Sequence, residues 1–183
     1  MNKKDILFAF LCGLAVAWIA SDFITKYGWL FYIVLPLLSI LGLWVVELIG
    51  RKFLFAHQAG KFALAGAFAD VVDIKVYQLV ILALPFSIVI KAFSFLVATA
   101  IKYWANKTWS FSAQNNPAKG WEILKFFSVT IVGLIIDIAA FYYLEKVHIG
   151  ISATLWLELC IIIAALITAI WNFLGYKFLV FKK

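Results

Sequence analysis

Charged residues are scarce in this sequence. Asp, Glu, Lys and Arg make up 14% of the 183 residues, whereas soluble domains average about 25%. Hydrophobic residues make up 66%, and the mean hydropathy is +1.05. The apolar runs are continuous rather than alternating, which favours membrane helices over a β-barrel. The composition therefore excludes a soluble globular fold and predicts an all-α, polytopic membrane protein.

Cysteine and histidine are equally rare, with two of each. Cys12 and Cys160 fall inside apolar runs, so we expect packing residues rather than a disulfide. We expect His57 and His148 in separate loops, and no spacing typical of a metal site occurs. There is also no nucleophile–base arrangement and no glycine-rich phosphate loop. The sequence therefore predicts no metal, no cofactor and no enzymatic activity.

Six apolar runs are each long enough to cross about 30 Å of hydrocarbon. They predict six transmembrane helices at residues 5–23, 28–49, 60–83, 86–105, 122–145 and 151–175. The linkers between them are short. One alternative stays open for the first run: Lys3 and Lys4 followed by an apolar stretch ending near Ala17 also fit a secretory signal peptide.

The basic residues indicate how the helices are oriented. The net charge is +7, and only Lys26 and Lys146 fall on one side of the predicted membrane. By the positive-inside rule, both termini then face the cytoplasm and the chain lies in the cytoplasmic membrane. Basic clusters at helix ends are typical of contact with anionic membrane lipids, so we expect no nucleic-acid partner. The other side collects Lys3, Lys4, Arg51, Lys52, Lys61, Lys107, Lys119, Lys125, Lys177, Lys182 and Lys183.

A short basic-aromatic phrase ends each of three predicted hairpins. The three phrases are Arg51–Phe55, Asn106–Phe111 and Tyr176–Phe181. The second and third hairpins also share a Gly followed four residues later by Asp, at 66 and 70 and at 133 and 137. These matches predict three parallel hairpin repeats: an N-terminal hairpin at 1–56, which we interpret as a diverged copy, and a four-helix domain at 60–183 with repeats 60–111 and 122–181.

Residues 60–183 resemble the GtrA-like family of small membrane proteins. The resemblance is carried by Lys61-Phe…Gly66…Asp70 with Asn106-Lys-Thr-Trp-Ser-Phe111, and by Lys125-Phe-Phe…Gly133…Asp137 with Asn172…Tyr176-Lys-Phe-Leu-Val-Phe181. Three positions depart from the family pattern: Leu179 replaces the usual Trp, Tyr176 the usual Asn, and Lys102 a helical Asn.

The resemblance implies a function in the cell envelope. It implies translocation of a polyprenyl-phosphate-linked sugar (such as one on undecaprenyl phosphate) across the cytoplasmic membrane, for glycosylation of surface polysaccharide or teichoic acid. Two alternatives stay open: a membrane partner of a glycosyltransferase, which itself transports no lipid, and a small proton-coupled exporter. A second copy of the chain is a further expected partner, because a small bundle has thin walls.

Such a translocator needs cations for the lipid phosphate. Basic and amide side chains at the predicted cytoplasmic ends are the candidates, because charge-assisted contacts to phosphate use these residue types. The same residue types also anchor helix ends at the interface without binding anything, which is the simpler interpretation. The candidate phosphate-binding residues are Lys107, Lys177, Arg51, Asn106, Asn172 and Trp109.

The translocator also needs a polar transport groove. Charged residues inside membrane helices are costly and usually functional. Asp70 and Asp137 hold matching repeat positions, so we expect them to face each other, with one protonated during part of the cycle. The alternative is structural pairing of the acids with Lys75 or Lys91, or hydrogen bonds to Tyr77 or Ser94. The candidate groove residues are Asp70, Asp73, Asp137, Lys91 and Glu158.

Overall fold

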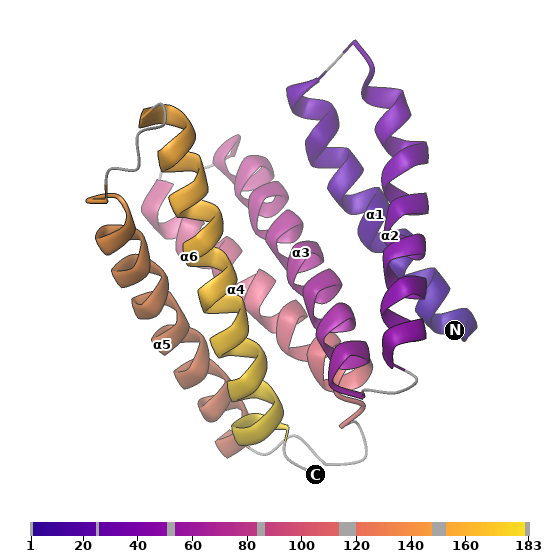
Figure 1. The fold of residues 1–183 in the computed structure, drawn as a ribbon. Coiled ribbons are helices and arrows are strands. Elements are labelled where there is room, and N and C mark those ends of the chain that lie inside the picture. The colour runs from indigo at the N-terminus through magenta and orange to yellow at the C-terminus, as the bar shows by residue number, and fades with distance from the viewer. Residues whose placement is uncertain are drawn as a thin grey trace. The chain divides into compact units, whose positions relative to one another are not determined.

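The computed structural model describes residues 2–24, 26–50, 54–83, 87–113, 120–147 and 153–181. These residues form helices, without a strand in the described part (Figure 1). The all-α prediction is therefore confirmed, and the described residues contain six α-helices. The elements are α1 (Lys3–Phe23), α2 (Gly28–Gly50), α3 (Leu54–Ile81), α4 (Ser87–Ala105), the π-helical turn η1 (Asn106–Ser110), α5 (Gly120–Leu144), α6 (Ala153–Gly175) and the π-helical turn η2 (Tyr176–Val180).

Helix bounds match the predicted ones within two residues except at α3. This helix begins at Leu54 rather than near 60, so His57 lies in a helix and its predicted place in a loop was wrong. The reason is local, because the stretch from Leu54 to Gly60 contains Leu, Ala and Gln and no Pro, and so continues a helix readily. Arg51 and His148 lie outside the described residues.

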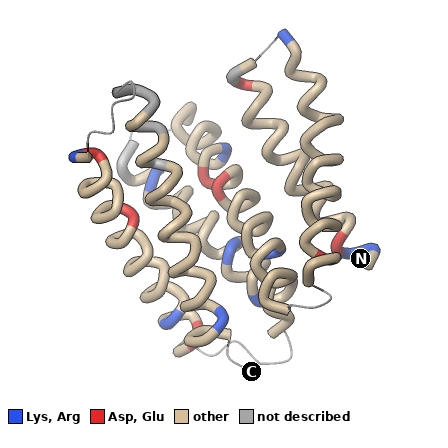
Figure 2. The backbone as a smooth tube through the Cα atoms, viewed as in Figure 1, with Lys and Arg blue, Asp and Glu red and all other residues tan. Residues whose placement is uncertain are grey.

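Four described helical segments are long and apolar enough to cross a membrane, by length and composition. They are Lys3–Asp22, Gly28–Gly50, Gly120–Leu144 and Ile162–Val180. The chain is thus a multi-pass membrane protein. α3 is longer than any of them, with 28 residues, but it carries charges along its length (Figure 2). Its charges, and not a lack of length, therefore distinguish it from the four.

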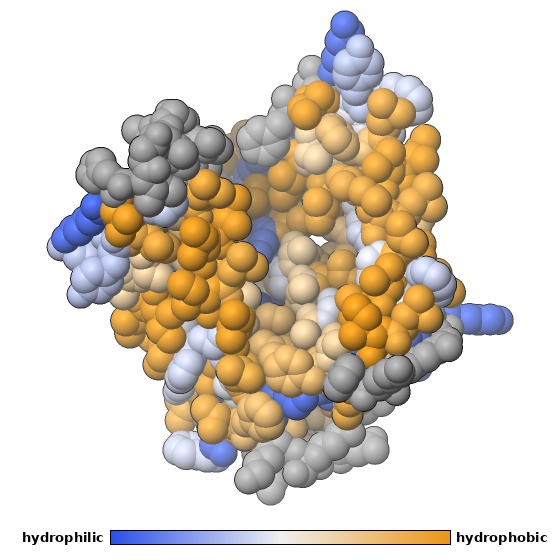
Figure 3. Space-filling view, in the orientation of Figure 1, coloured by the Kyte–Doolittle hydropathy of each residue, from blue (hydrophilic) through white to orange (hydrophobic). Residues whose placement is uncertain are grey.

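The chain divides into two compact units, Met1–Ser112 and Ala113–Lys183. In the first unit α1 and α2 form a hairpin, and α3 packs against α1, α2 and α4. In the second unit α5 and α6 form a hairpin, and η2 packs against α5. Hydrophobic residues cover most of the helix sides drawn in Figure 3. Large apolar side chains such as Leu37 (60% exposed) and Ile170 (62% exposed) suit contact with lipid rather than water.

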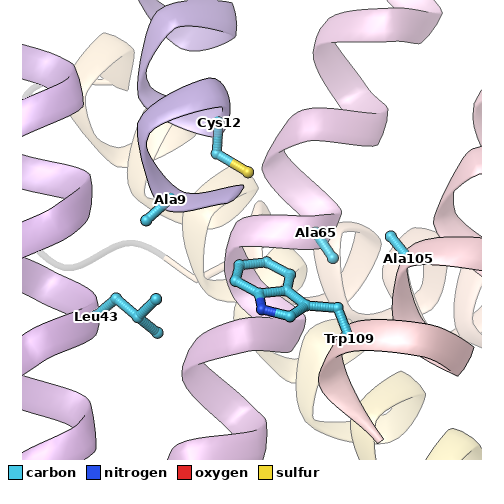
Figure 4. Packing of buried hydrophobic residues seen from close by; sticks show 6 residues of the cluster. All are labelled: Ala9, Cys12, Leu43, Ala65, Ala105 and Trp109. Atoms are coloured by element: carbon cyan, nitrogen blue, oxygen red, sulfur yellow. The ribbon is translucent and has the colours of Figure 1, made fainter. Parts of the chain in front are cut away.

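The core of the first unit is built from small residues around one indole. Ala9 and Cys12 of α1 and Ala65 of α3 lie close to Trp109 of η1, and Leu43 of α2 and Ala105 of α4 complete the cluster (Figure 4). Small residues let membrane helices approach closely, and the indole packs against them. Cys12 and Cys160 are both free and buried, which confirms their prediction as packing residues.

Gly13 sets the closest approach between α1 and α2. A Cβ at this position would lie 2.4 Å from the Pro36 Cα and 2.7 Å from the Leu35 carbonyl oxygen, and backbone atoms cannot move aside cheaply. We expect Gly13→Ala to lower the free energy of unfolding by about 1–3 kcal/mol, measured by denaturation in detergent micelles. Gly42→Ala is the matched control, because nothing lies within 4 Å of its Cβ. Equal stability of the two variants would contradict this packing.

Candidate functional site

Both basic-aromatic phrases that the structure describes in full begin as π-helical turns. In η1 the Phe111 N–H donates to the Asn106 carbonyl at 2.9 Å, and in η2 the Phe181 N–H donates to the Tyr176 carbonyl at 2.8 Å. π-turns are rare and occur frequently at functional sites. The sequence predicted anchors at these positions but not this geometry. The second and third predicted hairpins thus end in the same kind of turn.

An open groove of about 480 Å³ lies in the second unit, between the first turns of α5 and the turn η2. Because α5 and α6 run antiparallel, the start of α5 and the end of α6 meet at one end of this unit (Figure 1). The groove is lined by Trp121, Leu124, Lys125, Ser128, Val129, Phe178 and Leu179. It therefore combines a cation and a hydroxyl with an aromatic and aliphatic wall.

Lys125 gives this groove its charge. Its side chain is half-buried, and its Nζ lies 5.9 Å from the centroid of the Trp121 ring. Ser128 lies one turn further along α5, and its Oγ donates to the Leu124 carbonyl at 2.9 Å. A lysine with its stem on apolar surface and its ammonium at the rim is suited to an anion attached to an apolar chain. The groove therefore fits an amphiphile with a negatively charged head.

The predicted phosphate-binding residues are more covered than expected for interface anchors. Asn106 is fully buried and donates its Nδ2 to the Lys102 carbonyl at 2.8 Å. Lys107 is 7% exposed, and its Nζ lies 3.4 Å from the Tyr103 hydroxyl. Lys177 is half-buried, with its Nζ 5.7 Å from the ring of Phe178, which lines the groove. Lys177 thus borders the groove, whereas Lys107 is largely enclosed.

Trp109 takes part in a buried ion pair that the sequence did not reveal. Its Nε1 donates to the Asp5 Oδ1 at 2.7 Å, and the Lys61 Nζ lies 2.6 Å from the same oxygen. Exposure is 4% for Asp5, 7% for Lys61 and 6% for Trp109. The available sequence signal was that Asp5 is the first acid of the chain and directly precedes the apolar run 6–20.

The acids of α3 have different surroundings. Asp73 pairs with the Lys91 ammonium of α4 at 2.5 Å and accepts a hydrogen bond from the Ser94 hydroxyl at 2.6 Å. This is the structural pairing that the sequence left open as an alternative. Asp70 is exposed on α3 and has no hydrogen bond or ion pair within the described residues. Only Asp70 of these two acids therefore presents an uncommitted carboxylate.

A polar strip crosses between α5 and α6 in the second unit. Asp137 accepts a hydrogen bond from the Thr168 hydroxyl at 3.1 Å. One turn away on each helix, Asn172 packs against Gly133. A Cβ added to Gly133 would lie only 2.5 Å from the Asn172 Oδ1. That buried Oδ1 accepts no hydrogen bond from the part of the chain that is described. Gly133 therefore makes room for a polar side chain. The side chain of Glu158, the remaining predicted groove residue of this unit, lies outside the described residues.

A protein-family model described as GtrA/DPMS, transmembrane domain, matches residues 61–181. No curated protein and no solved structure matched the chain. The matched region contains both π-turns and the groove of the second unit, whereas α1 and α2 precede it. Because the match covers well over half of the 183 residues, the chain belongs to the GtrA/DPMS transmembrane-domain family.

Proposed function

We propose that the protein moves a polyprenyl-phosphate-linked sugar across the cytoplasmic membrane. The observation that carries this proposal is the groove of the second unit, in which Lys125 stands beside an aromatic and aliphatic wall. The family supports a function related to lipid-linked sugars. The excess of basic residues at the same helix ends supports a cytoplasmic position for the groove and for both termini.

In this proposal Lys125 and Lys177 hold the lipid phosphate, and Phe178 and Leu179 contact the start of the polyprenyl chain. The chain itself remains in lipid. The sugar follows the polar strip of α5 and α6, where the Asn172 Oδ1 is a buried acceptor without a partner in the described residues. A buried acceptor left unsatisfied is costly, so a passing sugar hydroxyl that donates to it is stabilised.

We further propose that all six helices cross the membrane, α3 and α4 included. Two ion pairs make the charges of α3 and α4 compatible with a membrane position. Lys75 pairs with Asp22 at 2.6 Å, and its Nζ lies 4.6 Å from the Trp18 ring. Asp73 pairs with Lys91. Intramembrane charges are tolerated where they pair with one another or face a polar path.

The two acids at matching repeat positions provide a test of the path. We expect both Asp70→Asn and Asp137→Asn to lower the initial rate of transbilayer movement of a fluorescent polyprenyl-phosphate sugar in liposomes, by about tenfold or more if each carboxylate contributes a charge-assisted contact. Glu145→Gln is the control, because Glu145 is exposed in the turn that follows α5. Wild-type transport rates in both Asp variants would show that these acids do not contribute to the transport path.

The two alternatives give different results in the same liposomes. A non-transporting partner of a glycosyltransferase accelerates no lipid movement, whereas sugar transfer by its enzyme depends on its presence. A proton-coupled exporter responds to an imposed pH gradient, moves a cationic solute, and does not require Lys125. The proposed translocator requires Lys125 and moves the lipid-linked sugar without a cationic solute.

A further inference from the structure

In the repeat register Lys61 and Lys125 are offset by three residues, about one helical turn, so they lie at similar rather than identical places in the two units. Lys61 lies in the N-terminal part of α3, which packs against η1, and Lys125 lies in the first turns of α5, which packs against η2. Within the two π-turns, Trp109 corresponds to Leu179. In the second unit this corner is the open groove beside Lys125. In the first unit the same corner is filled by Asp5, which comes from α1.

The Asp5 carboxylate is held as a bound anion would be. Two donors converge on its Oδ1: the Lys61 ammonium at 2.6 Å and the Trp109 indole N–H at 2.7 Å. The Asp5 backbone N–H donates to the Asn2 Oδ1 at 2.8 Å, and Phe8 stacks on Trp109 with ring centroids 5.0 Å apart. A lysine and an N–H donor aimed at one oxygen are the groups that bind a phosphate oxygen elsewhere in proteins.

An apolar cavity adjoins this anion position. It has a volume of about 70 Å³ and is lined by side chains of α1, α3, α4 and η1, Trp109 and Cys12 among them. Apolar cavities of this kind stay dry, and one of about 150 Å³ takes up benzene. The smaller cavity here has room for a short segment of a hydrocarbon chain. An anion position next to an apolar cavity fits a lipid with a charged end better than a free ion.

We propose that Lys61 and Trp109 form a second site for a phosphate-bearing lipid, and that Asp5 of the N-terminal hairpin occupies it from within the chain. This inference takes its class of ligand from the proposed function. Asp5 precedes the region matched by the family, whereas Lys61 and Trp109 lie inside it. The N-terminal hairpin therefore makes the two repeats unequal: the Lys125 groove stays open to lipid phosphate, and the Lys61 site is closed.

Counting bound lipids on the full chain tests this proposal. Native mass spectrometry in a non-ionic detergent with dodecyl phosphate should show one bound molecule on the wild type and two on Asp5→Ala. The added molecule should disappear in Asp5→Ala/Lys61→Ala and remain in Asp5→Ala/Lys125→Ala. Inorganic phosphate at the same concentration should not displace it. Displacement by inorganic phosphate would show that the site binds a free anion rather than a lipid, and would overturn the proposal.

Asp22→Ala is the matched control, because it breaks the other pair between α1 and α3, Asp22 with Lys75, without exposing Lys61 or Trp109. It should bind one molecule, as the wild type does. If Asp5→Ala does not fold, Asp5→Asn keeps the shape and removes the charge; dodecyl phosphate should then raise its melting temperature more than that of the wild type. A single bound molecule on folded Asp5→Ala, or equal melting shifts for Asp5→Asn and the wild type, would overturn the proposal.

The result also separates this inference from the proposed function. No lipid on the wild type together with one Lys61-dependent lipid on Asp5→Ala would refute phosphate binding in the Lys125 groove and support the second site. One Lys125-dependent lipid on the wild type and one on Asp5→Ala would support phosphate binding in the groove and refute the second site.

Discussion

Lys125→Ala should slow transbilayer movement of the lipid-linked sugar by roughly 10- to 100-fold. Lys125 is the charged residue among those that line the groove of the second unit. A hydrogen bond to a charged group contributes about 1.5–3 kcal/mol, and about 1.4 kcal/mol corresponds to a tenfold change in rate. Liposomes with a fluorescent lipid-linked sugar and a membrane-impermeant quencher measure the initial rate.

Two further variants sharpen this result. Lys125→Arg keeps the charge and should retain most of the rate, because a guanidinium also binds phosphate. Lys146→Ala removes a lysine from the other end of the same hairpin, where its Nζ lies 3.6 Å from the Tyr142 ring centroid, and should leave the rate unchanged. A folded Lys125→Ala variant with the wild-type rate would show that the groove does not hold the phosphate.

The second large effect concerns stability. Asp5→Leu should lower the free energy of unfolding by about 3–5 kcal/mol, because removal of one partner of a buried ion pair leaves the other charge uncompensated. Here the remaining charge is Lys61, which is 7% exposed, and the Trp109 N–H also loses its acceptor. Circular dichroism during titration of detergent micelles with a denaturing detergent measures the change.

The double variant Asp5→Leu/Lys61→Met distinguishes a lost pair from a packing defect. It replaces both charges with apolar groups of similar size, and such replacements are often neutral or stabilising. We therefore expect most of the lost stability to return. Asp22→Leu leaves Lys75, also 7% exposed, without its partner, but should cost less than Asp5→Leu, because the Asp22 side chain is 42% exposed and water can reach that end of the pair. A double variant as unstable as Asp5→Leu would contradict this interpretation of the buried pair.

The sequence predicted the helices well because a membrane leaves little choice. Backbone polar groups must pair within each segment, so a long apolar run becomes a helix whatever it packs against. The start of α3 escaped prediction because Phe55 and His57 resembled an interface linker, whereas local helix propensity extends the helix back to Leu54. The π-turns also escaped prediction, since no simple spacing distinguishes them from the last turn of an α-helix.

The site was harder to predict because it depends on contacts between distant residues. Trp109 and Asp5 are 104 residues apart, and no periodicity pairs them. In the sequence, Lys125 resembled the other lysines that indicate membrane topology. Its place in the groove becomes visible only when η2 packs against α5. One sequence signal was available but was not used: Leu179 stands where the GtrA-like pattern has Trp, and this smaller side chain lines the groove.

Translocation itself is tested most directly with the purified wild-type chain in liposomes that carry a polyprenyl-phosphate-linked sugar in both leaflets. The measured quantity is the fraction of the lipid that an impermeant reagent reaches over time. With the protein present, nearly all of the lipid should become accessible much faster than in protein-free liposomes. Accessibility that stops at the outer leaflet, with the protein shown to be folded in the same liposomes, would contradict the proposed function.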